Sequence, residues 1–192
     1  MAISPVEEKI ITATVECIEK YGIKGTTIRQ IAEQAGVNIA AINYYFRSKD
    51  ALIERCMRQT LHNAFDWDDI EKLPGRTANE RCKAIFHEIL EGGLKYQGIT
   101  RAHVYDLLVD GNYLTPFTET INEFIKKLVE DLKGRGATLP EGELYLALIQ
   151  ITNSVMMFVL TPDVFESRFG MSLREPESRK RYIDRLVNRL LD

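Results

Sequence analysis

The sequence predicts an all-α protein, and three observations support that fold class. Apolar residues recur at intervals of three and four along most of the 192-residue chain, which is the spacing of one helix face. The 12 glycines and 6 prolines are scattered at positions where helices can end. No run of alternating β-branched residues lies between turn signals, so no strand is indicated. Hydrophobic residues make up 45% of the chain, which is enough for a sizeable core in one or two domains.

The first two predicted helices are expected to support a third helix that follows them. The first runs from Ile3 to Tyr21, with an inward stripe of Val6, Ile10, Val15 and Ile18. The second begins at Thr26-Thr27, whose hydroxyls can accept hydrogen bonds from the free amides at a helix start. Gly36 comes just after its last apolar residue, where a left-handed residue can end the helix, so a sharp turn is expected there.

The third predicted helix begins after Asn38, which is a good N-cap residue. Its inward positions are Ile42 and Phe46, and its outward positions are Ile39, Ala40, Asn43 and Tyr44. A slim helix with small residues near its start, preceded by a tight glycine turn and a supporting helix, fits a DNA major groove roughly 12 Å wide. The segment from Thr26 to Lys49 therefore predicts a helix-turn-helix that reads DNA.

The same segment resembles the tetracycline-repressor (TetR) family of bacterial transcription regulators. The resemblance covers about the first third of the chain and rests on Gly22, Thr26-Thr27, Ile31-Ala32, Ala35-Gly36-Val37, Ile42, Tyr45-Phe46, Lys49 and Leu52. It implies a three-helix DNA-binding domain over residues 1–49 and a helical ligand-binding and dimerisation domain over residues 50–192. It also implies a homodimer that leaves double-stranded, pseudo-palindromic operator DNA when a small molecule binds. Asn43 stands where the family often has tyrosine, and Ala40-Ala41 where glycine and threonine are frequent, so the operator sequence is not transferable.

The candidate DNA contacts divide into backbone anchors and base readers. The resemblance places backbone contacts at Thr27, Tyr45 and Lys49, and Tyr44 is expected to join them or to reach a base. Base readout is assigned to the exposed start and middle of the third helix, namely Asn38, Ile39, Ala40, Ala41 and Asn43. An asparagine can bond an adenine edge in two places, and alanine or isoleucine can meet a thymine methyl group. The alternative is that both tyrosines pack the domain core and that Asn38 is only a helix cap.

The net charge of −3 is the main objection to a DNA-binding function. Between Met1 and Asp50 the lysines and arginines are balanced by an equal number of acidic residues. Most of those acids lie on the first helix, whereas four of the six cations bracket the second and third helices. A small positive face is therefore expected, made of Lys24, Arg29, Arg47 and Lys49, with Arg29 among the candidate DNA contacts.

Behind this domain, a connecting helix is predicted over residues 50–67, and the breaker cluster at residues 73–77 predicts a loop. Three further helices are expected at Asn79–Tyr96, Thr100–Asp110 and Pro116–Lys133. Their apolar residues form a core whose aromatic side chains could wall a cavity, with polar residues that orient a ligand. The candidate ligand contacts are Phe86, His87, His103, Tyr105, Phe117, Asn122 and Phe124, and plain core packing is the alternative for most of this set. Tyr96, Leu107 and Leu108 are also expected in that core.

Two C-terminal helices are expected to form the dimer interface. The apolar stretch 144–160 is interrupted by polar residues and is shorter than a membrane span of about 20 apolar residues, so a buried interface is favoured over a membrane. Residues 177–191 combine an apolar stripe with arginines and a lysine around it. The family resemblance favours a four-helix homodimer interface made by these two helices and their copies. The alternative is that both helices only close the core of one subunit.

Several classes of protein are disfavoured. The sequence has no glycine-rich phosphate loop, nucleophile motif or metal-spaced ligands, so neither an enzyme nor a cofactor or metal site is expected. The first residues lack a secretory signal pattern, and the three cysteines are expected to be small apolar residues in a reducing cytoplasm, with a redox-sensing thiol pair as the alternative. A helical binding module whose DNA-binding surface has lapsed is the second rival to a regulator.

Overall fold

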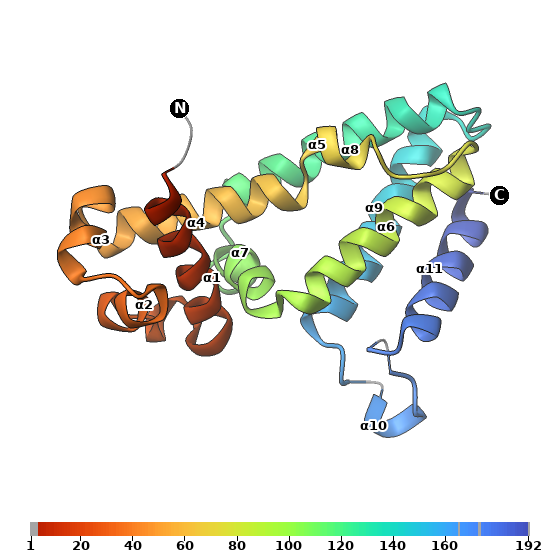
Figure 1. Ribbon diagram of the computed structural model, residues 1–192. Coiled ribbons are helices and arrows are strands. Elements are labelled where there is room, and N and C mark those ends of the chain that lie inside the picture. The colour runs from red at the N-terminus through yellow and green to blue at the C-terminus, as the bar shows by residue number, and fades with distance from the viewer. Residues whose placement is uncertain (1–3, 165, 173, 192) are drawn as a thin grey trace. The chain divides into compact units, whose positions relative to one another are not determined.

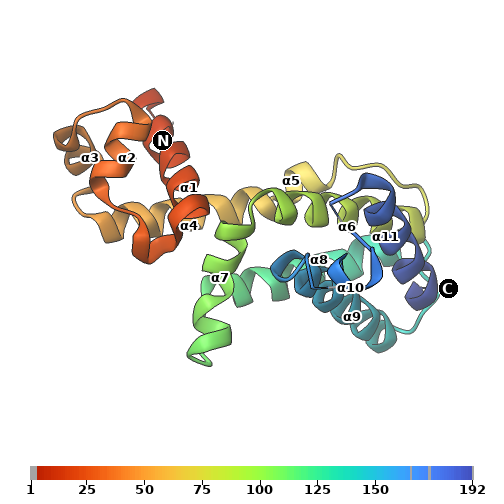
Figure 2. The ribbon, with the colours of Figure 1, turned by 90° about the horizontal axis from the view of Figure 1, so that it is seen from below.

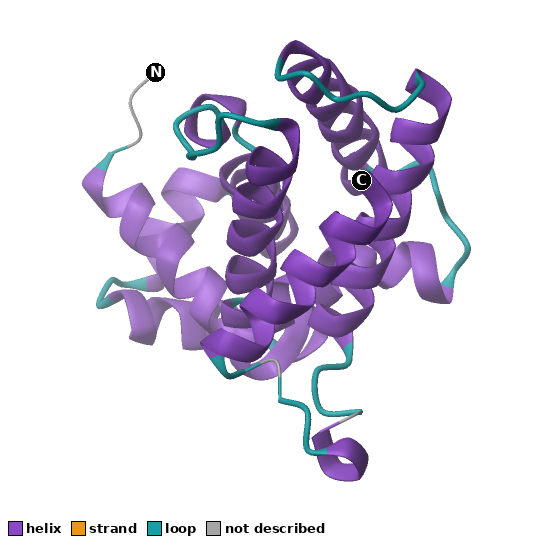
Figure 3. Ribbon diagram, turned by 90° about the vertical axis from the view of Figure 1, so that its right-hand side faces the viewer, coloured by secondary structure: helices purple, strands orange, loops and turns teal. Residues whose placement is uncertain are grey.

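The computed structural model describes residues 4–164, 166–172 and 174–191, and every regular element in those ranges is an α-helix (Figures 1 and 3). The all-α prediction is therefore confirmed. In chain order the helices are α1 (Pro5–Gly25), α2 (Ile28–Ala35), α3 (Ile39–Phe46), α4 (Lys49–Ala64), α5 (Trp67–Ile70), α6 (Ala78–Lys95), α7 (Gln97–Val109), α8 (Pro116–Gly134), α9 (Glu141–Leu160), α10 (Glu166–Phe169) and α11 (Pro176–Leu191).

Three predicted helix boundaries were wrong, and the expected start at Ile3 lies outside the described residues. Helix α7 begins at Gln97 instead of Thr100. The first helix continues past Tyr21 to Gly25, although Gly22 inside it has a φ of 68° and marks a kink. The connecting helix ends at Ala64 instead of residue 67, because the Asp66 carboxylate accepts a hydrogen bond from the Asp68 amide (3.1 Å) and caps a new short helix, α5. The four-residue helix α10 was not predicted.

The chain packs into two compact units. Unit 1 comprises Met1–Asn63 and Tyr96–Tyr113, and unit 2 comprises Ala64–Lys95 and Leu114–Asp192. The chain therefore enters unit 1 twice, first with α1 to α4 and later with α7. The functional boundary expected at residue 49 stays a prediction, since these units are defined by packing alone.

Unit 1 is held together by one apolar core beneath α1, α2, α3 and α4. The predicted stripe of α1 is only partly right, because Ile10 and Ile18 are fully buried whereas Val6 and Val15 lie at the margin of the core. The buried members from all these helices and α7 are Ile10, Ile11, Ala13, Cys17, Ile18, Ile31, Ala32, Ile42, Phe46, Leu52, Ile53, Cys56 and Ile99. The short helices α2 and α3 thus depend on α1 for burial, as expected for elements too short to be stable alone.

Helix α7 is attached to α1 through its N-terminus. The two carboxylate oxygens of Glu19 accept hydrogen bonds from the amides of Gly98 (2.9 Å) and Ile99 (2.7 Å), which have no partner within the helix. A negative charge at a helix N-terminus is also favoured by the helix dipole. A Cβ atom on Gly98 would lie 2.7 Å from Cα of Glu19, so the close approach of the two backbones requires glycine.

Unit 2 is a bundle of α6, α8, α9 and α11 around a second core (Figure 1). That core includes Phe86, Leu90, Phe124, Leu128, Leu144, Leu148, Ile151, Val155, Ile183 and Val187. The expectation that Tyr96, Tyr105 and Leu108 belong to a ligand-domain core was wrong. All three residues lie in unit 1 and are exposed, and Leu108 is 65% exposed.

Helix α9 is long and apolar enough to cross a membrane by length and composition. Its inner side chains, among them Leu144, Leu148 and Ile151, are completely buried in the core of unit 2. Core packing therefore accounts for the apolar residues on the inner side of α9, whereas Leu146, Ile149 and Met157 of the same helix are exposed.

The predicted loop at residues 73–77 is tied to the bundle by a partly buried ion-pair cluster around Arg81. The fully buried guanidinium of Arg81 on α6 donates to the carboxylate of Asp131 on α8 (3.0 Å) and to the carbonyl of Leu73. Arg135 donates to the same carboxylate (3.1 Å) and to the carbonyl of Gly75 (2.7 Å). Breaking such a cluster by removing one partner leaves an uncompensated buried charge.

Replacing Gly98 with alanine is expected to destabilise unit 1, because the new Cβ would collide with the backbone of Glu19. The matched control is Gly92→Ala in α6, where a Cβ meets nothing within 4 Å and the gain in helix propensity is about 1 kcal/mol. Thermal unfolding should therefore show a lower Tm for Gly98→Ala and a slightly higher Tm for Gly92→Ala. Equal Tm values for the two variants would contradict the tight α1–α7 approach.

Candidate nucleic-acid interface

The start of α2 is fixed by a capping box. The hydroxyl oxygen of Thr27 accepts from the Gln30 amide (3.3 Å), and the Gln30 side chain accepts from the Thr27 amide (2.8 Å). Thr26, the other hydroxyl considered for this cap, is instead fully buried and donates to the carbonyl of Gly22 (2.8 Å). Thr27 remains exposed at the start of α2, and its hydroxyl also donates to the side-chain oxygen of Gln30 (2.7 Å).

The turn between α2 and α3 is formed as predicted. Gly36 adopts the left-handed conformation (φ 64°, ψ 34°), and its amide donates to the carbonyl of Glu33 (3.2 Å). The Val37 amide donates to the carbonyl of Ala32 (3.0 Å), which completes the helix-ending motif. Asn38 then caps α3, because its side-chain oxygen accepts from the Ala41 amide (2.7 Å).

Helix α3 has one buried side and one exposed side. Ile42 and Phe46 are buried in the core of unit 1, as predicted. Ile39, Ala40 and Asn43 are exposed, and α3 lies on the outside of unit 1 (Figures 1 and 2). The side that carries the candidate base contacts is therefore free to meet a partner.

The two tyrosines at the end of α3 are not core residues. Tyr44 is 82% exposed and Tyr45 is 38% exposed, and their rings meet edge to face with centroids 5.2 Å apart. The alternative that both rings pack the domain core is wrong for Tyr44. For Tyr45 it accounts only for the covered part of the side chain. For Asn38 the cap role is observed, which leaves the side-chain NH₂ group available and a base contact still a prediction.

The expected positive face is only partly available. Lys49 is half-buried and its ammonium donates to the carbonyl of Ile23 (3.4 Å), and Lys24 lies over the ring of Tyr105 and donates to its phenol oxygen (3.2 Å). Arg29 and Arg47 are exposed, and no described residue accepts a hydrogen bond or forms an ion pair with either guanidinium. No local sequence pattern indicates two further features, namely the Glu19 cap of α7 and the backbone conformation of Arg47.

The predicted ligand contacts are divided between the two units. His103 and Tyr105 lie in unit 1, where Nε2 of His103 is 3.0 Å from the hydroxyl of Thr60 on α4. The others lie in unit 2: Phe86, Phe117 and Phe124 are buried, Asn122 is exposed, and His87 approaches Asp184 of α11 (3.5 Å). Phe86 and Phe124 contact each other edge to face, as core residues do. The ligand assignment stays a prediction.

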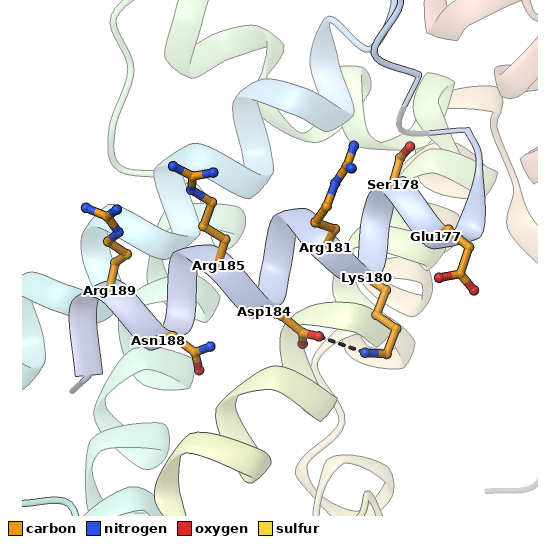
Figure 4. A pocket seen from close by; sticks show the side chains of 8 residues that line it. All are labelled: Glu177, Ser178, Lys180, Arg181, Asp184, Arg185, Asn188 and Arg189. Atoms are coloured by element: carbon orange, nitrogen blue, oxygen red, sulfur yellow. Dashed lines mark hydrogen bonds and ion pairs between the residues drawn. The ribbon is translucent and has the colours of Figure 1, made fainter.

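A groove along α11, open to solvent, has a charged lining (Figure 4). Arg181, Arg185 and Arg189 point to one side of the helix, and Lys180 pairs with Asp184 (2.8 Å) on the other. None of the predicted ligand contacts lines this groove, and its lining does not suit an apolar molecule.

The three cysteines are buried, as expected for small apolar residues. Burial raises the pKa of the Cys56 thiol to about 12 and also raises the pKa of Cys17 and Cys82. Neutral, buried thiols are poor nucleophiles, which argues against a redox-sensing pair. No group of three or more potential metal ligands occurs in the part of the chain that the structure describes.

Comparisons with known proteins agree with this geometry. Residues 10–56 match the family model described as bacterial regulatory proteins, tetR family. A Bacillus subtilis protein named "Probable HTH-type transcriptional regulator YttP" is 26% identical over 94% of this chain and 89% of its own length. The HTH-type transcriptional regulator BetI of Escherichia coli is 38% identical, but over only 40% of each chain. The solved structure of the transcriptional regulator FadR from Bacillus subtilis, in complex with stearoyl-CoA, is similar over 96% of this chain and 97% of that one, with a TM-score of 0.62 and 20% identity.

The pKa of His103 is expected to lie well below its ordinary value, because burial lowers it from 6.5 to about 4. The unfolded chain then binds a proton between these two pH values that the folded chain does not. The free energy of unfolding should therefore fall as the pH is lowered from about 6.5 to about 4, by up to about 3 kcal/mol from this residue. NMR titration of His103 measures the pKa directly. The variant His103→Gln should show a weaker loss of stability over this pH range, and an identical loss would contradict the assignment.

Proposed function

This chain is a member of the tetR family of bacterial regulatory proteins and a transcriptional regulator, and from that premise we propose that it is a repressor released from operator DNA by a small molecule. The observation that carries the proposal is the two-sided helix α3. Its buried side fixes it to the core of unit 1 through Ile42 and Phe46, while its other side exposes Ile39 together with small and polar groups. A slim helix presented in this way suits the major groove. A cytoplasmic location follows from such a role.

We assign base readout to the start and middle of α3. Asn43 is exposed and can form two hydrogen bonds with an adenine edge, and Ile39 and Ala40 can contact thymine methyl groups. Asn38 and Ala41 complete this set. Thr27, Tyr44, Tyr45 and Lys49 are assigned to the phosphate backbone, with Arg29 beside them. For Lys49 this requires the ammonium to leave or share the carbonyl of Ile23.

We propose that the active form is a homodimer that uses α9 and α11. The inner faces of both helices close the core of unit 2, which was the alternative to a dimer interface. Helix α9 nevertheless keeps an exposed apolar stripe with Leu146, Ile149 and Met157, spaced so that they lie along one side of the helix. A twofold dimer would cover that stripe and would hold two recognition helices about 34 to 36 Å apart, one turn of DNA.

The proposed switch is an equilibrium between two dimer states that differ in the spacing of the recognition helices. A ligand that relieves repression almost completely must favour the second state by about 10⁴-fold, or roughly 5.5 kcal/mol. The chain offers two direct links for such a change. Helix α4 follows the recognition helix, and α7, which Glu19 fixes to α1, follows α6 after a single residue, Tyr96. The FadR structure shows that a protein of this fold holds an acyl-CoA, so stearoyl-CoA is the first ligand to test.

The test of DNA binding is a selection of duplexes by the purified protein from a random pool, followed by fluorescence anisotropy with the selected duplex. A regulator should select a sequence with two related half-sites. A helical binding module that no longer binds DNA would select no sequence. The other alternative, an enzyme, is tested by screening for substrate turnover.

Replacing Asn43 with alanine should change the base preference of the protein, because a paired adenine contact is worth about 1 to 3 kcal/mol of discrimination. Replacing Tyr45 with phenylalanine should weaken binding to all duplexes by a similar factor, since the phosphate backbone carries no sequence information. Parallel selections with wild type and both variants distinguish the two effects. Uniform weakening by Asn43→Ala would refute its assignment to base readout.

Replacing Ile149 with glutamate should convert the dimer to a monomer, because it places a charge in the proposed apolar interface. Val164→Glu is the matched control, since Val164 is an equally apolar side chain of unit 2 and is 55% exposed, compared with 41% for Ile149. Analytical ultracentrifugation measures the mass of each variant. A dimeric Ile149→Glu variant, or a monomeric wild type, would contradict the interface.

A further inference from the structure

Arg47, between α3 and α4, has an unusual backbone conformation. It is the one non-glycine residue with a positive φ in the part of the chain that the structure describes, at φ 66° and ψ −39°. The amide of Ser48 donates to the carbonyl of Phe46 (2.7 Å), so Arg47 is the central residue of a three-residue γ-turn. The positive-φ form of this turn is rare and strained.

The turn itself does not need an arginine. The described residues with positive φ elsewhere in the chain are glycines, such as Gly36 at the end of α2, and glycine adopts these conformations without a steric penalty. Residues held in sparsely populated backbone regions cluster at functional sites. The strained position of Arg47 therefore directs attention to its side chain.

The side chain of Arg47 is exposed directly after the last residue of α3. Helix α3 contains no charged residue, so any positive charge near its exposed side must come from flanking positions. Of the flanking cations, the ammonium groups of Lys24 and Lys49 already contact Tyr105 and the Ile23 carbonyl. Arg29 on α2 and Arg47 after α3 are the two whose guanidinium groups have no hydrogen-bond or ion-pair partner among the described residues.

We propose that Arg47 binds a phosphate of the operator backbone next to the C-terminal end of the recognition helix. The inference rests on the proposed DNA-binding function and adds a contact that the sequence did not assign. A guanidinium can bind phosphate oxygens through two parallel hydrogen bonds, which gives the contact direction as well as charge. The C-terminal end of each recognition helix is then held to the DNA backbone by a positive charge, which α3 itself does not contain.

The experiment compares Arg47→Gly with wild type in two measurements. Glycine relieves the strain of the turn, so the Tm should be equal to or above that of wild type. Affinity for a duplex should fall by about tenfold at low salt, and the slope of log K against log salt should become less steep by about 1 per subunit. The base preference should not change. Loss of affinity without loss of stability separates a DNA contact from a structural role.

Two further variants serve as controls. Arg47→Lys keeps the charge and should retain most of the salt slope with reduced affinity. Arg168→Gln on α10 removes an exposed arginine from unit 2 and should leave the slope unchanged. An unchanged slope in Arg47→Gly, or a change equal to that of Arg168→Gln, overturns the proposal. A fall in Tm with an unchanged slope overturns it as well, because Arg47 would then be structural.

Two additional outcomes separate this inference from its premise. A wild-type protein that binds no duplex even at low salt overturns both the proposed function and the role of Arg47, whereas binding with an unchanged slope in Arg47→Gly overturns only the latter. Thermal unfolding in inorganic phosphate and in chloride at equal ionic strength tests a free anion as the occupant. Stabilisation of wild type but not of Arg47→Gly by phosphate, without any difference in DNA binding, would overturn the operator contact.

Discussion

The burial of Ile42 and Phe46 beneath α3 is the constraint on which the arrangement of unit 1 depends. Helix α3 has only eight residues, too few to be stable alone in water, so its conformation must come from packing. Two side chains one turn apart are enough to fix both its position and its rotation about its axis. That rotation determines which residues are exposed. The exposed set comprises Ile39, small and polar groups, and an 82% exposed tyrosine, Tyr44.

Much of this local structure could be predicted because each step has a short-range signal. Gly36 and Asn38 act through their own backbone and side chain, and the spacing of Ile42 and Phe46 reveals the inward face directly. The end of α4 at Ala64 was missed because the apolar pattern continues beyond it. The side chain of Asp66 caps a new helix there, and such a cap can end the preceding helix. The exposure of Leu108 was missed because an apolar residue on a predicted helix is assigned to a core by default.

The candidate ligand site was the least predictable part. Aromatic residues such as Phe86 and Phe124 obey the same spacing whether they fill a core or wall a cavity, and here they contact each other. Polar residues are no better guide, since His103 and Tyr105 contact Thr60 and Lys24 within unit 1. These contacts join residues that lie 43 and 81 positions apart, and no local pattern encodes such a pairing. The backbone of Arg47 escaped notice for a related reason, because no local sequence rule predicts a positive φ at arginine.

The attachment of α7 to α1 has a consequence for how this chain can be divided. Unit 1 needs residues from two separate stretches, and Ile99 from the second stretch fills part of its core. A fragment that stops at Asn63 would uncover that part of the core and leave the Glu19 carboxylate facing water. An exchange of the N-terminal segment with a relative would have to preserve a carboxylate at position 19 and a glycine at position 98 together. The N-terminal segment that contains the recognition helix is therefore not an independent folding unit.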